Sequence, residues 1–269
     1  MKKLSLALMA VLAFSRAGCG DFFDIPDPEP DPDPEPDPVE EAIITLETTE
    51  AILTNGETFQ ILAECESPIT YTSEDEYYAT VSEDGLVTAG FVGSTSILLD
   101  SGSDTKTFEV TVQPTVDLYP EPEIQFGESK DEIIERFGTP DEDDEEAGAI
   151  LYTNYTENAM LMVSFDEDNL AEYYAVVVGV DLEPKVDAFL NERYLFVKEE
   201  EGIKLYINAL TVEQTTLIVG SQNVEGSFIM IVYGANNSGD EGGDEGGDEG
   251  GDGAGKGARF VKILKNFRK

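Results

Sequence analysis

Residues 79–89 read Ala-Thr-Val-Ser-Glu-Asp-Gly-Leu-Val-Thr-Ala and predict two short strands joined by a tight turn. Apolar and polar residues alternate on both sides of the turn, as they do in strands that bury one face. Gly85 supplies the freedom in φ that such a turn needs. This stretch therefore predicts a β-hairpin with one side in a hydrophobic core.

The same alternation continues on both sides of this hairpin, over residues 42–113. Turn signals recur about every ten residues, and Asn55-Gly56 is one of them. The further strand patterns are 43–46, 58–64, 70–73, 94–99 and 107–112. Cys65 follows an alternating run, so we expect it to be a small buried side chain. Short strands at this spacing predict a β-sandwich.

Four pieces of this segment resemble the bacterial immunoglobulin-like (Ig-like) domain, group 2. They are Leu-Thr-Asn-Gly-Glu-Thr at 53–58, Ile-Thr-Tyr-Thr-Ser-Glu-Asp at 69–75, the hairpin at 79–89, and Gly-Ser-Thr-Ser-Ile at 93–97. Tyr71 stands where the family commonly has Trp. The resemblance implies a spacer or adhesion module of a cell-surface protein, without catalytic residues.

The pattern changes near residues 113–122, from strands alone to helices and strands. Ser129 and Glu132 have the spacing of a helix capping box, and Pro140 ends that helix. A second helix is predicted to begin near Pro184. We expect 141–146 to be an acidic loop. The expected strands are 149–155, 159–165, 170–180, 194–198, 203–208, 214–220 and 227–233.

A helix followed by antiparallel strands, repeated twice, predicts a tandem α+β domain over residues 119–235. The fold class is thus multidomain, an all-β Ig-like sandwich followed by an α+β domain with an antiparallel sheet, and we expect the two domains to fold independently. Residues 127–140 resemble the opening helix of the small lipoprotein of the outer-membrane assembly machine, and the tandem layout resembles the β-lactamase inhibitor protein fold. These resemblances imply fold only, and leave a protein-contact inhibitor or envelope assembly factor as an alternative function.

Residues 1–18 predict a secretory signal peptide, because two lysines precede an apolar run that is too short to span a bilayer. Ala-Gly-Cys at 17–19 resembles a bacterial lipoprotein lipobox, with Arg16 where that family usually has an apolar residue. The resemblance implies cleavage before Cys19 and its acylation, and hence a lipid anchor in the outer membrane of the cell envelope, facing either side of it. An ordinary secretory signal is the alternative. Residues 19–41 continue as an acidic Pro-rich linker that favours an extended chain.

The C-terminal part changes composition twice. Residues 236–256 are an acidic Gly-rich spacer, and 257–269 are a basic amphipathic tail. Its apolar residues Phe260, Ile263, Leu264 and Phe267 share one helical face. We expect a partly helical tail that packs into neither core and binds either an anionic membrane or the acidic surface of its own chain.

Composition excludes several functions. The net charge is −41, from 57 acidic and 16 basic residues, so nucleic acid is not an expected partner. The chain has no His, which removes Ser-His and Cys-His catalytic pairs and most zinc sites. No carboxylate pair stands out among so many. We therefore predict no enzyme activity, no cofactor and no metal, with a secreted carboxylate-dependent hydrolase as an alternative.

Two tyrosine pairs are the candidates for ligand contact, Tyr77 with Tyr78 and Tyr173 with Tyr174. Strand alternation would turn one ring of each pair outward, where it could stack on a sugar or a protein. The sequence thus predicts a noncatalytic envelope lipoprotein whose Ig-like spacer presents a C-terminal binding module for a protein or polysaccharide. It does not predict the ligand or the oligomeric state.

Overall fold

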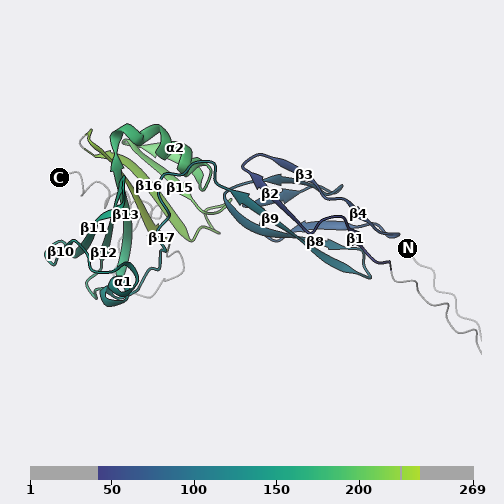
Figure 1. Ribbon diagram of the computed structural model, residues 1–269, viewed down its shortest axis with the longest axis horizontal. Coiled ribbons are helices and arrows are strands. Elements are labelled where there is room, and N and C mark those ends of the chain that lie inside the picture. Colours follow the sequence, from purple (N-terminus) through teal and green to yellow (C-terminus); the bar gives the residue numbers. More distant parts are fainter. Residues whose placement is uncertain (1–41, 225, 237–269) are drawn as a thin grey trace, which may run out of the picture. The chain divides into compact units, whose positions relative to one another are not determined.

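The computed structural model describes residues 42–224 and 226–236 (Figure 1). The expected signal peptide, Cys19 with the linker after it, the acidic spacer beyond Asn236 and the basic tail lie outside the described residues. Antiparallel β-sheet dominates the described part of the chain. No helix within it is long and apolar enough to cross a membrane.

The N-terminal part of the described chain is built from three small sheets. The largest has the order β2 (Glu50–Thr54), β9 (Thr105–Gln113), β8 (Gly93–Asp100) and β5 (Thr70–Ser73). A second has the order β3 (Thr58–Gln60), β7 (Leu86–Ala89) and β6 (Ala79–Val81), and β1 (Thr45–Leu46) pairs with β4 (Ala63–Glu64). The β2–β9 pair is parallel, and the other pairs of these sheets are antiparallel.

These sheets bury their inward side chains in one cluster, as expected for a β-sandwich. Its centre comes from both larger sheets, with Ile97, Phe108 and Val110 on one side and Ala79 and Val87 on the other. The hairpin at 79–89 forms as predicted, with Ala79 opposite Ala89 in the ladder. The mostly antiparallel sandwich fits an Ig-like fold.

Gly85 is required in that hairpin for two reasons. Its φ is +80°, in the left-handed region that favours glycine. A Cβ atom there would also lie 2.9 Å from Cζ of Tyr71, whose ring is half-buried against the sandwich core. Only glycine at position 85 therefore allows both the turn and the close packing of the Tyr71 ring.

The run 58–64 is not one strand, contrary to expectation. It divides into β3, which pairs with β7, and β4, which pairs with β1. Between them the Ile61 amide donates to the Gly85 carbonyl at 3.0 Å, and the Leu62 carbonyl accepts from the Glu47 amide at 3.3 Å. The chain changes sheets at this point, which alternation alone cannot indicate. Cys65 beyond it is a free thiol, half-buried against the core.

The C-terminal part of the described chain is an eight-stranded antiparallel sheet with two α-helices. Its strands, in spatial order, are β10 (Glu142–Asp144), β11 (Ala149–Thr156), β12 (Ala159–Phe165), β13 (Ala171–Gly179), β17 (Phe228–Ala235), β16 (Leu217–Val224), β15 (Ile203–Ile207) and β14 (Leu195–Glu200). β13 and β17 form the central pair, so the two halves of the sheet meet there (Figure 1).

Both α-helices pack on one face of this sheet. α1 (Lys130–Phe137) has the predicted capping box, in which the Ser129 side chain accepts from the Glu132 amide. α2 (Glu183–Asn191) has Pro184 in its first turn, also as predicted, and follows a short 3-10 helix, η1 (Val180–Leu182). Ile133 from α1 and Phe189 from α2 are fully buried in the same cluster.

The prediction of a loop at 141–146 is wrong for residues 142–144, although residues 145 and 146 do lie in a turn. Glu142–Asp144 form edge strand β10, paired with β11, and all three side chains are exposed. Asp141 holds the start of this strand, since its Oδ2 accepts from the Thr153 amide at 2.7 Å and the Thr153 hydroxyl at 2.8 Å. Charged side chains on an edge strand hinder pairing with another chain.

Candidate functional site

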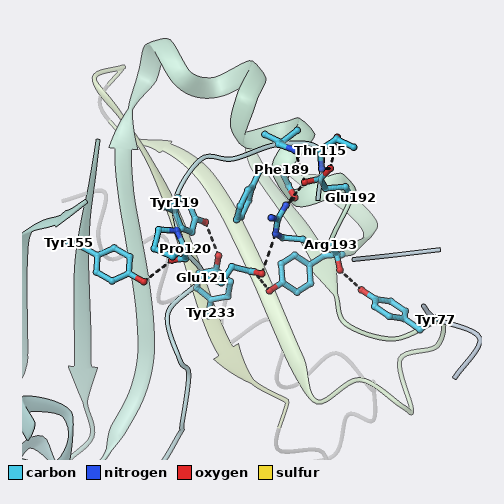
Figure 2. Close-up of polar contacts among 12 residues, drawn as sticks. Tyr77, Thr115, Tyr119, Pro120, Glu121, Tyr155, Phe189, Glu192, Arg193 and Tyr233 are labelled. Atoms are coloured by element: carbon cyan, nitrogen blue, oxygen red, sulfur yellow. Dashed lines mark hydrogen bonds and ion pairs between the residues drawn. The ribbon is translucent and has the colours of Figure 1, made fainter. Parts of the chain in front are cut away.

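Tyr77 is a buried tyrosine, not the exposed ring of its pair. Its hydroxyl donates to the backbone carbonyl of Arg193 at 2.7 Å and lies 3.2 Å from that of Ile207 (Figure 2). Its ring stacks on Phe91, with centroids 4.4 Å apart. Burial raises the pKa of Tyr77 well above its usual range, so the hydroxyl stays neutral and remains a donor.

Tyr78 is half-buried beside it. The two rings meet edge to face at 5.3 Å. Gly93 makes room for the second ring, because a Cβ atom at Gly93 would lie 2.2 Å from Cε1 of Tyr78. This pair is therefore fixed by packing, and Tyr78 is the ring with access to solvent.

The second tyrosine pair lies elsewhere, on β13. Tyr174 is fully buried, donates to the Gln125 carbonyl at 2.9 Å and lies 3.2 Å from an Arg136 guanidinium nitrogen. Tyr173 is half-buried on the opposite face of the sheet. The four predicted contact residues thus do not form one site, and Tyr77 and Tyr174 present no ring to a ligand.

Glu192 and Arg193 follow α2 and form a buried polar centre that the sequence did not indicate. Oε2 of Glu192 accepts from the Thr115 amide at 2.9 Å and hydroxyl at 2.8 Å, and Oε1 accepts from the Val116 amide at 3.1 Å (Figure 2). The Glu192 backbone carbonyl accepts from the Val92 amide at 2.8 Å. These bonds hold the segment at 115–116 and the loop before β8.

The Arg193 side chain completes this centre. One of its terminal nitrogens lies 2.5 Å from Glu192 Oε1, and its guanidinium lies 3.7 Å above the Phe189 ring. Nε lies 3.2 Å from Glu121 Oε2, an ion pair whose angle does not suit a hydrogen bond. Burial raises the pKa of Glu192, but the hydrogen bonds from Thr115, Val116 and Arg193 outweigh it, so the pKa is lowered and the group is ionised near neutral pH.

Beside Tyr77 the surface is hollowed into an open polar cleft of about 670 Å³. We call it the polar cleft. Its lining residues are Ser73, Glu74, Asp75, Glu76, Tyr77, Tyr78, Asn208, Ala209, Leu210, Thr211, Gln214 and Thr216. The volume is in the range of small-molecule sites, about 300–1,000 Å³.

Both walls of the polar cleft are held by local hydrogen bonds. Oδ1 of Asp75 accepts from the Tyr77 amide at 2.9 Å, which closes an Asx turn. On the other wall, Oδ1 of Asn208 accepts from the amides of Thr216 at 3.0 Å and Leu217 at 2.9 Å. Glu74 lines one wall and Gln214 lines the other, and both side chains are exposed.

The lining of the polar cleft is mainly polar. Carboxylates, amides and hydroxyls line it together with one partly exposed aromatic ring. Within residues 42–224 and 226–236, no three acidic or thiol side chains are placed to hold a metal ion. The carboxyl groups with a shifted pKa, those of Asp104, Glu132, Asp141 and Glu192, all have a lowered pKa, and none of them lines the cleft.

Sequence reasoning missed most of this site. One signal is present in the sequence, since Glu74-Asp75-Glu76 directly precede Tyr77 and Tyr78. The wall at 208–216 carries no motif, and its Asn and Thr residues resemble those of any loop. Only the folded chain brings it opposite Tyr78.

No family model and no curated protein matches this chain. Solved structures that align with it include domains 5–6 of the S-layer protein SbsC, at 13% identity and a TM-score of 0.24, covering 74% of this chain and 85% of that chain. Another is a mutant of intimin from EHEC O157:H7, at 14% identity and a TM-score of 0.22, covering 67% and 86%. At these TM-scores the alignments add nothing to the strand topology, on which the Ig-like interpretation rests.

Proposed function

We propose that this protein is a noncatalytic, lipid-anchored envelope protein that binds a saccharide in the polar cleft. In this proposal the Ig-like domain of residues 42–113 and the tandem α+β domain of residues 119–235 each supply one wall of the cleft. The observation that carries it is the lining of the cleft, where hydroxyl, amide and carboxylate groups surround one accessible tyrosine ring. A saccharide matches this lining because its hydroxyls both donate and accept and its ring faces stack on aromatic groups.

The proposed site is pre-organised, which favours recognition of a small polar ligand. Asn208 and Asp75 use their side chains to fix the two walls, as described above, so they are supports. Among the other exposed lining residues, Glu74 and Gln214 are assigned to ligand contact, one from each wall, and Gln214 Oε1 also accepts from the Thr211 hydroxyl at 3.3 Å. A protein partner would instead be expected to need a larger and more apolar patch.

The test is binding of the full chain to an array of envelope polysaccharides and peptidoglycan fragments, followed by titration calorimetry with the best ligand. We expect Glu74→Gln and Gln214→Ala each to weaken binding about tenfold, the effect of roughly one hydrogen bond. Glu157→Gln is the matched control, because Glu157 is exposed but does not line the cleft.

Three results would contradict this proposal. One is that no saccharide on the array binds. Another is that the Glu157 control weakens binding as much as Glu74→Gln does. The third is saccharide cleavage by the wild-type chain that Glu74→Gln abolishes, which would support the hydrolase alternative.

The lipid anchor predicts a separate result. Cys19→Ala should move the protein from the membrane fraction to the soluble fraction of the native cell, because acylation at Cys19 is the proposed attachment. Incorporation of labelled fatty acid checks the chemistry directly. A Cys65→Ala chain should still fractionate with membranes. Unchanged fractionation of Cys19→Ala, without lipid on the wild-type chain, would favour the ordinary secretory signal.

A further inference from the structure

The eight-stranded sheet has two apolar faces, and both described α-helices pack on only one of them. Ile133, Val186, Phe189 and Leu190 of the helices belong to the cluster on the helix side. The cluster on the other face contains strand residues alone among the described residues. We call this second face the bare face because no described helix packs on it, although its central side chains are buried, with Val232 at 0% and Leu205 at 7% exposure. Its members are Met162, Tyr173, Ala175, Val177, Ile203, Leu205, Ile218, Val224, Met230 and Val232.

Strand register shows that the bare face is continuous across the sheet. Met162 lies opposite Ala175, which lies opposite Val232. Val232 lies opposite Gly220, which in turn lies opposite Leu205. This row therefore crosses β12, β13, β17, β16 and β15 with small residues at its middle and larger ones at both ends. Alanine and glycine project little from the sheet, so the row is lower at these two positions than at its ends. We call this row the apolar groove.

Methionines are gathered on this face. Met160 lies opposite Val177, which lies opposite Met230, so these residues form a second row beside the first. Together with Met162, they are the methionines of the described chain. Methionine is flexible and polarisable and is common on surfaces that accept apolar side chains of varied shape.

We propose that the basic tail of this chain, residues 257–269, binds the bare face as an amphipathic helix. Phe260, Ile263, Leu264 and Phe267 would enter the apolar groove. The proposal replaces the expectation, drawn from the sequence alone, that the tail packs into neither core. The sequence showed an apolar tail face, but the second apolar face of the sheet became apparent only from the register.

The length of a helical tail matches the width of the apolar groove. A helix of thirteen residues is about 20 Å long at 1.5 Å per residue. The five strands of the groove have four spacings of about 4.8 Å, or about 19 Å. The chain leaves the sheet from β17, which is the middle strand of the groove. The spacer at 236–256 has a root-mean-square span of about 25 Å if it behaves as a Gly-rich coil, so the tail reaches the face at high effective concentration.

The charge of the tail can also be compared with the charges at the edges of the bare face. The tail carries Arg259, Lys262, Lys265, Arg268 and Lys269. Register places Glu142 of β10 on the bare face, since it lies opposite Leu151, which lies opposite Met162. At the other edge, Lys198 of β14 lies opposite Leu205 and Glu200 lies opposite Ile203, and these two side chains form an ion pair. The β10 edge of the apolar groove therefore carries a carboxylate, which complements a basic helix with one apolar stripe.

The test uses methionine methyl signals in nuclear magnetic resonance, because Met160, Met162 and Met230 all lie on the bare face. The sample is the Cys19→Ala chain, which keeps every other residue. We expect Leu264→Asp to shift the signals of Met162 and Met230, since the aromatic rings of the tail would leave the groove. Asn266→Asp is the matched control, because it adds the same charge on the polar side of the tail and should leave these signals in place.

A synthetic peptide of residues 257–269 provides the second measurement. It should return the methyl signals of the Leu264→Asp chain toward those of the parent. It should also bind that chain at least about tenfold more tightly than the parent, whose own tail competes for the groove.

Four outcomes would overturn the proposal. The first is methyl signals that Leu264→Asp leaves unchanged, and the second is equal shifts with Asn266→Asp. The third is methionine methyl signals of the parent chain that change with protein concentration, which would mean that a second copy of the chain covers the bare face. The fourth is that Leu264→Asp abolishes binding to phosphatidylglycerol vesicles but leaves the methionine methyl signals in place, which would mean that the tail binds a membrane.

Discussion

Phe189→Ala is expected to lower the free energy of unfolding of the eight-stranded sheet by about 3–5 kcal/mol, the usual cost of removing a buried aromatic side chain. Phe189 is fully buried, and its ring centroid lies 4.6 Å from that of Tyr119. It also lies beneath the Arg193 guanidinium. The substitution thus opens a cavity and removes the apolar support of a buried cation.

Urea denaturation followed by far-ultraviolet circular dichroism measures this effect, since the chain has no Trp for fluorescence. Phe196→Ala is the matched control, because Phe196 is 47% exposed on β14. It should cost less than about 1 kcal/mol. Equal losses for the two variants would mean that Phe189 is not part of a rigid core.

Glu192→Ala should also be strongly destabilising, by about 3–5 kcal/mol, the usual cost of removing one partner of a buried ion pair. Its side chain is 8% exposed, and its carboxylate accepts from Thr115, Val116 and Arg193. Without it two backbone amides lose their acceptor, and the buried Arg193 charge keeps only Glu121 as an ion-pair partner. The control is Glu200→Ala, whose side chain is 54% exposed in its ion pair with Lys198, and which should cost about 0–1 kcal/mol.

The same residue predicts a pH dependence. The pKa of Glu192 is lowered from its ordinary value of 4.5 in the folded chain. Its contribution to stability is therefore complete above that value and is lost as the pH falls through the lower, folded pKa. The difference in unfolding free energy between the wild type and Glu192→Gln should be largest near pH 7 and should shrink below pH 4.5. A difference that is constant between pH 7 and pH 3 would contradict the ionised pair.

Local patterns predicted most of the elements. The hairpin at 79–89, the capping box at Ser129 and the proline-started second helix are each specified within a few neighbouring residues, and each forms as expected. The predictions for 58–64 and 141–146 failed for a common reason. Whether such a run is one strand, two strands or a loop depends on which distant strand supplies its hydrogen bonds.

The candidate site also combines features that neighbouring residues indicate with features that depend on distant parts of the chain. Strand alternation predicts that one ring of the pair Tyr77 and Tyr78 faces outward, and Tyr78 does line the polar cleft. Tyr77 instead donates to a carbonyl 116 residues away in the sequence, which no local pattern indicates. In the sequence, Glu192 and Arg193 resemble ordinary charged residues at the end of a helix. Their role is visible only in the structure, where Thr115 contacts Glu192 and Glu121 contacts Arg193.

The sequence by itself determined the all-β sandwich pattern, the two helices and the periodicity of the sheet strands, because alternation, capping and turn chemistry act over neighbouring residues. Only the tertiary structure decided the buried Glu192 centre, the polar cleft and the continuous bare face. Those features depend on long-range pairing, and above all on register, which sets side chains from five strands in one row across the sheet. A one-residue shift in any of those pairings would turn that strand's apolar side chains to the other face.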